Sequence, residues 1–118
     1  MKKILFLGAF ALAMFLVQCT KDSVDTVTCT GTTPTYTADI KAIMDASCAI
    51  SGCHNASSKA DGYDLSTYAG TSSAAGKNAF LGSVQHKSGY DAMPKGGSKL
   101  SDATLTKIAC WVQNGTPQ

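Results

Sequence analysis

The most informative stretch of this chain is Cys48-Ala49-Ile50-Ser51-Gly52-Cys53-His54. Two thiols followed directly by a histidine are typical of covalent haem attachment. The thiols add across the two vinyl groups of a haem, and the adjoining imidazole becomes the proximal ligand of the iron. Most attachment loops have two residues between the cysteines, whereas this one has four. We expect the extra length to bulge outward at Ser51 and Gly52, because glycine accepts a positive φ without a Cβ clash.

Two other uses of the same side chains remain open. Cys48 and Cys53 could form a disulfide that closes a small loop, or they could join His54 and a fourth ligand in a zinc site. Only the shorter cysteine spacing is a specific signal for haem, so the rest of the chain has to decide.

The N-terminus predicts export. Lys2 and Lys3 precede the fourteen-residue apolar run Ile4–Val17, which is shorter than the ~20 residues needed to span a bilayer and is typical of a secretory signal. The run ends at Leu16-Val17-Gln18-Cys19, which resembles the lipobox of bacterial lipoproteins. We therefore predict a signal peptide over residues 1–18 and a lipid on Cys19. The alternative is ordinary cleavage that leaves Cys19 as a free thiol.

The five cysteines can all be assigned on this interpretation. Cys19 takes the lipid and Cys48 and Cys53 hold the haem, which leaves Cys29 and Cys110 as a disulfide pair. Disulfides persist outside the cytosol, so this pairing suits an exported protein. Without haem, the four cysteines after Cys19 could pair in three ways.

The charge of the expected mature chain is balanced. Once residues 1–18 are removed, eight Lys stand against eight Asp, with no Arg and no Glu. A nucleic-acid partner is not expected, since it would need a basic face or stripe. The propionates of a haem would have to rely on Lys, Tyr, Trp or backbone donors, because there is no Arg.

The composition divides the mature chain into a tether and one small domain. Residues 19–35 are rich in Thr, together with Ser, and predict a membrane tether, and residues 36–118 predict a single folded domain. Apolar spacing predicts a first helix over about 37–47, and Ser101 is a candidate N-cap of a last helix that ends before Gly115. Short helices are expected near 66–72 and 75–85, and strand pairs are not. Counting 100° per residue places Cys110 on the outer side of the last helix and Trp111 at the edge of the core.

Six segments follow one another in a characteristic order and spacing over roughly residues 35–116. They are Thr35-Tyr36-Thr37-Ala38-Asp39-Ile40, Ser51-Gly52-Cys53-His54-Asn55, Gly62-Tyr63-Asp64-Leu65-Ser66-Thr67-Tyr68, Met93-Pro94-Lys95-Gly96-Gly97, Leu100-Ser101-Asp102 and Trp111-Val112-Gln113-Asn114-Gly115. In these segments the chain resembles the small class I c-type cytochromes, in particular the one-haem domains of bacterial lipoproteins.

The resemblance implies a mainly α fold in which N- and C-terminal helices and long loops surround a covalently bound haem. Cys48 and Cys53 would hold one haem c, His54 would be its proximal ligand and Met93 its distal ligand. Met93 is also favoured by its own setting, because Pro94 restricts its backbone, whereas Met44 lies on the apolar side of the first helix and is expected in the core. His86 is the competing candidate for the sixth ligand. Its other possible roles are to pair with a haem propionate or to be a solvated loop histidine.

The function expected from the sequence is that of an electron carrier and not an enzyme. The protein would pass single electrons between redox partners of the cell envelope, and a lipid on Cys19 would anchor it to a membrane, with the outer membrane expected. One alternative is a haem sensor or peroxidase-like protein with a labile sixth ligand. Another is a haem-free interaction lipoprotein held together by disulfides.

Overall fold

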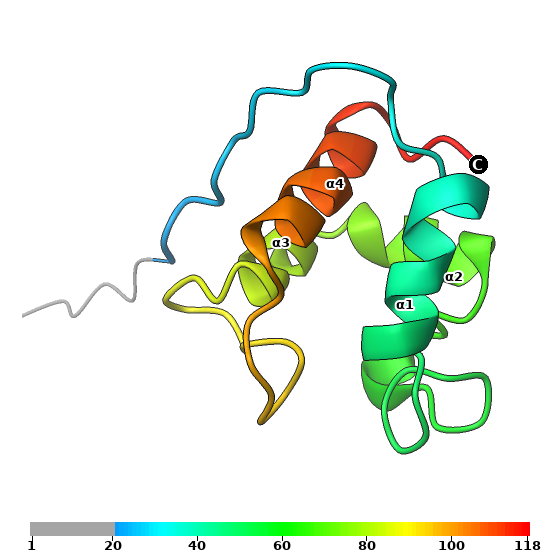
Figure 1. The fold of residues 1–118 in the computed structure, drawn as a ribbon. Coiled ribbons are helices and arrows are strands. Elements are labelled where there is room, and N and C mark those ends of the chain that lie inside the picture. The colour runs from blue at the N-terminus through cyan, green and yellow to red at the C-terminus, as the bar shows by residue number, and fades with distance from the viewer. Residues whose placement is uncertain (1–20) are drawn as a thin grey trace, which may run out of the picture.

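Four short α-helices and long loops make up the fold. The computed structural model describes residues 21–118, so the expected signal peptide and the lipid site at Cys19 lie outside the described residues. No strand occurs in this part of the chain, and the prediction of a mainly α fold is confirmed (Figure 1). The elements are a π-helical turn Tyr36–Ile40, α1 Lys41–Ser47, a 3-10 turn Ala60–Gly62, α2 Tyr68–Ala75, α3 Ala79–Val84 and α4 Asp102–Gln113.

Side-chain caps fix where the first and last helices begin. The Thr35 hydroxyl accepts a hydrogen bond from the Ala38 N–H (3.3 Å), and the Thr35 N–H donates to the Asp39 carboxylate (3.1 Å). At α4, the Ser101 hydroxyl accepts from the Thr104 N–H (3.2 Å), so the predicted N-cap is confirmed. Each cap satisfies a backbone N–H that has no partner inside its helix.

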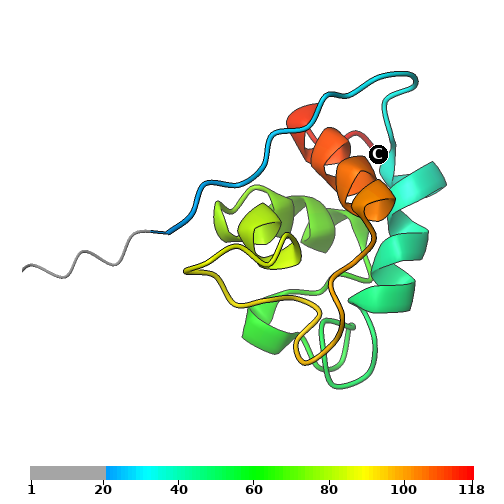
Figure 2. The same cartoon turned by 60° about the vertical axis from the view of Figure 1, so that its left-hand side comes forward.

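The first and last helices share the core. Four of the largest fully buried side chains come from them: Ile40, Met44, Ile108 and Trp111. Figures 1 and 2 show α4 crossing the N-terminal end of the first helical segment, with α2 and α3 covering the other side of the core. The predicted core position of Met44 is confirmed.

Trp111 is a correction to the expected arrangement, because its side chain is 0% exposed and does not lie at the edge of the core. The C-terminal tail folds back over it. The Trp111 indole donates to the Pro117 carbonyl (2.8 Å), and the same carbonyl accepts from the Tyr36 N–H (2.9 Å). The helical angle of Trp111 could not predict this cover, since the covering residues lie beyond the helix.

The buried aromatic cluster contains one unpaired hydroxyl. The Tyr36 ring packs at 5.4 Å from the Tyr68 ring and 6.3 Å from Trp111 between centroids. Its hydroxyl oxygen is buried and has no hydrogen-bond partner among the described residues. By contrast, the Tyr68 hydroxyl donates to the Thr116 carbonyl (2.9 Å). The two tyrosines therefore form a matched pair that differs in hydrogen bonding.

We expect Tyr36→Phe to raise the free energy of unfolding by about 1 kcal/mol, because it removes a buried polar group that gains nothing in the fold. Tyr68→Phe should lower it by a similar amount, because the Thr116 carbonyl loses its donor. Urea denaturation of the two variants measures both changes. A destabilised Tyr36→Phe protein would show that its hydroxyl has a partner in solution.

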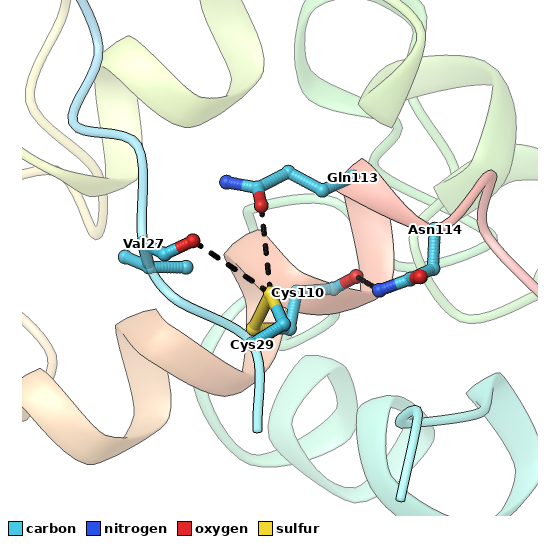
Figure 3. Close-up of a disulfide and its surroundings, with 5 residues drawn as sticks. All are labelled: Val27, Cys29, Cys110, Gln113 and Asn114. Carbon is cyan, nitrogen blue, oxygen red and sulfur yellow. Dashed lines mark hydrogen bonds between the residues drawn. A yellow bond between two sulfur atoms is a disulfide. The ribbon is translucent and has the colours of Figure 1, made fainter. Parts of the chain in front are cut away.

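The sulfur atoms of Cys29 and Cys110 lie 2.12 Å apart, with a Cα–Cα distance of 5.6 Å (Figure 3). This separation is within the usual range for a disulfide, and it joins the two cysteines that the sequence left as a pair. The dashed contacts of the Cys29 sulfur in Figure 3 are packing contacts, since a disulfide sulfur has no proton to donate. The bond fastens the segment before the first helix to α4.

The described part of the tether is not free. Residues 21–35 run over the outside of α3 and α4 toward the start of the first helix, as Figures 1 and 2 both show. Backbone and side-chain groups of Asp22 and Asp25 bond to residues that follow α3, at Ser88 and Gln85. The folded unit therefore begins before residue 36, the expected boundary. The composition of this segment did not indicate these contacts, because its polar groups find their partners in residues distant in the sequence.

None of the helices formed within residues 21–118 is both long enough and apolar enough to cross a membrane.

Candidate functional site

One cavity collects the residues that the sequence singled out. Its volume is about 650 Å³, within the ~300–1,000 Å³ typical of small-molecule and cofactor sites. Cys48, Cys53, His54 and Met93 all line it. The structure thus brings together the two thiols, the imidazole and the thioether, although Met93 lies far from the others in the sequence. Much of the remaining wall is apolar and includes Leu65, Ala74, Phe80 and Val84.

The loop from Cys48 to His54 accommodates its four-residue spacer by bulging outward, as predicted. Ile50, Ser51 and Gly52 are exposed, and Gly52 has a φ of 78°. Behind the bulge the loop closes on itself, since the His54 N–H donates to the Cys48 carbonyl (3.1 Å). The extra residues therefore project into solvent while both cysteines stay at the cavity wall.

The ring of His54 is oriented by its backbone surroundings. Its Nδ1 lies 3.0 Å from the Ala60 carbonyl oxygen, in the 3-10 turn that follows the loop. A carbonyl only accepts, so Nδ1 must carry the proton in this hydrogen bond. The lone pair is then on Nε2, the nitrogen left to bind a metal. An N–H donated to a backbone carbonyl is the usual support of a metal-binding histidine.

The backbone of Met93 is held from two sides. Its N–H donates to the Ser83 carbonyl at the end of α3 (3.0 Å), and its carbonyl oxygen lies 2.9 Å from His86 Nε2. Because the carbonyl accepts, His86 Nε2 must carry a proton. His86 adopts a φ of 55° in making this contact, a region that non-glycine residues seldom occupy.

The structure gives His86 a role that the sequence did not suggest. It is absent from the lining of the cavity that holds Cys48, Cys53, His54 and Met93. It neither faces solvent freely nor points its bonded nitrogen at that cavity, but positions the loop that carries Met93. No pattern in the sequence signals this role, because a lone histidine seven residues before a methionine has no characteristic meaning.

The thiol of Cys48 is in an apolar setting. Burial raises its pKa to about 11, and the neighbouring Cys53 contributes to the increase. A raised pKa keeps Cys48 protonated and therefore poorly nucleophilic at neutral pH. Neither cysteine is bonded to a partner in the structure.

We expect Cys48 of the folded haem-free protein to alkylate slowly with iodoacetamide at about pH 8, with on the order of a hundredfold less thiolate than in the urea-unfolded chain. Its rate should rise as the pH approaches 11. The same thiol should make the fold less stable as the pH rises above the unfolded thiol's pKa, because the folded state resists its ionisation. Mass spectrometry of quenched samples follows the labelling. Equal rates in the folded and unfolded chain would contradict the burial of Cys48.

The cavity has charged groups on its wall as well. Lys21, Lys77 and Lys95 are exposed and line it together with Asp61 and Asp91. These lysines are the donors that could meet anionic groups of a ligand, in a protein without arginine.

Across residues 21–118, no group of three or more His, Cys, Asp or Glu side chains is arranged so that it could hold a metal ion. Cys48, Cys53 and His54 are not grouped in that way either. A haem iron held by one histidine and one methionine would not need such a group.

Comparison of the chain with protein-family models, with curated proteins and with solved structures finds no match.

Proposed function

We propose that this protein is a membrane-anchored monohaem c-type cytochrome that carries electrons in the bacterial cell envelope and is not an enzyme. The observation that carries the proposal is the meeting of Cys48, Cys53, His54 and Met93 at one cavity. Two thiols, an imidazole and a thioether are the set that c-type haem attachment and axial ligation require. The residues present therefore fit the group.

A bound haem would supply reversible one-electron chemistry at its iron. The residues of the chain would determine how that chemistry is used. Cys48 and Cys53 would retain the group covalently, and His54 would bind through Nε2, which its hydrogen bond to Ala60 leaves unprotonated. Met93 would provide a thioether, a ligand that favours the reduced metal and raises the reduction potential. The apolar wall would exclude water.

The location of the protein is part of the proposal. Export by the N-terminal signal would place the thiols in a compartment where Cys29 and Cys110 can stay oxidised. A lipid on Cys19 would keep the carrier at a membrane, with redox proteins of the envelope as its partners.

The test is expression in a host that has haem-attachment machinery. The haem should remain with the polypeptide after acid–organic extraction, and His54→Ala should abolish a normal c-type spectrum. Cys29→Ser is a control, because it removes a cysteine outside the cavity and should leave the haem bound. Complete extraction of the haem, or a colourless protein with a Cys48–Cys53 disulfide by peptide mapping, would refute the proposal.

The contact between His86 and Met93 gives a further prediction. His86→Ala should weaken ligation by Met93, because the hydrogen bond to its carbonyl (2.9 Å) is lost. A net loss of about 1 kcal/mol corresponds to an about fivefold larger population without the methionine bound. The intensity of the near-infrared sulfur-to-iron band and the rate of carbon monoxide binding measure that population.

His86→Gln is the matched control for this prediction. It keeps a side-chain N–H donor, and it occupies the same positive φ at the same strain as alanine. Recovery of the band in His86→Gln but not in His86→Ala would identify the hydrogen bond as the cause. An equal loss of the band in His86→Gln and His86→Ala would mean that His86 acts only through local folding.

A further inference from the structure

The segment from Lys21 to Cys29, which we call the strap, is bound to the domain by paired hydrogen bonds. The Asp22 N–H donates to the Ser88 carbonyl (3.0 Å), and the Ser88 N–H donates back to the Asp22 carboxylate (3.2 Å). Asp25 and the buried Gln85 form a second pair, through Asp25 N–H to Gln85 Oε1 (2.8 Å) and Gln85 Nε2–H to the Asp25 carbonyl (3.1 Å). Reciprocal pairs of this kind fix both the position of the strap on the domain and the direction in which its chain runs.

Three more contacts complete the attachment. Lys87 Nζ lies 2.6 Å from the Asp25 carboxylate. Gln113, with its amide turned to satisfy both groups, donates to the Val27 carbonyl and accepts from its N–H, each at 3.3 Å. The disulfide between Cys29 and Cys110 closes the far end. The strap is therefore held along its length, and not only at one point.

The N-terminal end of the strap lies at the mouth of the cavity. Lys21 lines the cavity, and its Nζ is 4.8 Å from the centroid of the Tyr90 ring, which lines it too. Lys21 packs so closely on Gly89 that a Cβ placed there would be 2.9 Å from Lys21 Cγ. The strap thus leads the chain to the cavity that Cys53, His54 and Met93 also line.

Chain length turns this contact into a constraint. Two residue steps separate Cys19 from Lys21, and they span at most about 7 Å. A tether held to the domain only by the disulfide at Cys29 would span ten residue steps, at most roughly 35 Å, and would leave the domain unoriented. With the strap bound, a lipid on Cys19 keeps the edge of the cavity at the membrane surface.

We propose that the strap turns the mouth of the cavity toward the bilayer, so that the phospholipid surface covers the mouth. This inference rests on the proposed function, in which Cys19 is lipidated. Among the exposed charged residues of the lining, three lysines, Lys21, Lys77 and Lys95, outnumber two aspartates, Asp61 and Asp91, and this excess of cations suits anionic phospholipid headgroups. Ile50, at 45% exposed, is the large hydrophobic side chain that the described residues leave exposed, and it lines the same cavity.

The unusual length of the spacer between Cys48 and Cys53 has a function in this arrangement. Ile50 lies in the bulge that the four-residue spacer creates, and it lines the same cavity as the three lysines. An exposed apolar side chain and exposed cations around one cavity match the boundary between headgroups and acyl chains. Electrons would then enter or leave on the membrane side, from a lipid-soluble or membrane-embedded partner.

The experiment uses the lipidated, haem-loaded protein in phosphatidylglycerol–phosphatidylethanolamine vesicles. A membrane-impermeant amine-acylating reagent labels exposed lysines, and mass spectrometry reads each site against the soluble Cys19→Ser protein. Lys21, Lys77 and Lys95 should react several times more slowly on vesicles. Lys41 on α1 and Lys107 on α4 lie outside the cavity lining and should react equally in both samples. The inference would be overturned if each of the five lysines reacted at the same rate on vesicles as in the soluble protein. It would also be overturned if the mass of the protein showed no lipid.

A second variant tests the strap itself. A flexible Gly/Ser linker of about ten residues, inserted between Thr20 and Lys21, keeps the lipid and the strap contacts but frees the domain to turn. The protection of the three lysines should then be lost, and protection that survives would overturn the role of the strap. Haem absorbance of the same samples is read separately. A colourless protein counts against the proposed function, while the lysine pattern decides the orientation.

Discussion

Replacing Met93 with alanine is expected to lower the reduction potential by on the order of 100 mV or more, since axial ligands set potentials over a range of about 0.8 V. The oxidised protein should also lose its near-infrared sulfur-to-iron band and bind carbon monoxide and cyanide quickly. The reason is that the thioether stabilises ferrous iron and occupies the sixth position. Potentiometric titration and stopped-flow absorbance measure these changes.

Met44→Leu is the matched control for Met93→Ala. It removes the other methionine of the domain, which is fully buried in the core, and conserves volume closely enough to keep the fold. Its potential and near-infrared band should be unchanged. If the wild-type protein lacked the band and His86→Ala, rather than Met93→Ala, admitted carbon monoxide quickly, the axial pair would be His54 and His86. If the wild-type protein bound carbon monoxide quickly, the sensor or peroxidase-like alternative would replace the carrier.

The second large effect is expected at Gly70, near the start of α2. A Cβ at this position would lie 1.8 Å from the Asp64 carbonyl oxygen and 3.1 Å from the Thr67 hydroxyl. The Thr67 hydroxyl is the N-cap of α2 and accepts from the Gly70 N–H (3.2 Å). Gly70→Ala should therefore destabilise the protein by about 3 kcal/mol or more, because a backbone atom cannot rotate out of the way as a side chain can.

Gly76→Ala provides the comparison in the same region. Its nearest neighbours would be 3.5 Å and 3.7 Å from the new Cβ, which is ordinary contact, and its φ of −70° suits alanine. This variant should be as stable as the wild type or slightly more stable. Thermal and urea unfolding of both variants give the measurement. Equal stability of the two would mean that the Asp64 loop moves away at little cost.

Local signals in the sequence predicted the local structure well. The Ser101 hydroxyl caps α4 as expected, and Gly52 takes the positive φ that the four-residue spacer required. The two short helices were expected near 66–72 and 75–85, and they occupy Tyr68–Ala75 and Ala79–Val84. Caps and glycine turns depend on neighbouring residues, so a sequence reveals them directly.

Long-range packing was not predictable in the same way. Trp111 is buried by a tail that no helical period describes, and the strap binds through Gln85, Ser88 and Gln113, residues with no distinctive motif. The sequence singled out Cys48, Cys53, His54 and Met93, which the structure brings to one cavity. It could not show that His54 would be oriented by Ala60 or Met93 by His86, because those contacts use backbone carbonyls, which every residue has.

One peptide tests most directly whether Cys48 and Cys53 hold a haem. Trypsin should release Ala42–Lys59, which contains Cys48, Cys53 and His54 and no other cysteine. We expect this peptide, from protein made with haem-attachment machinery present, to carry the added mass of one haem, and we expect neither cysteine to alkylate after reduction. An unmodified peptide in which both cysteines alkylate would contradict this expectation.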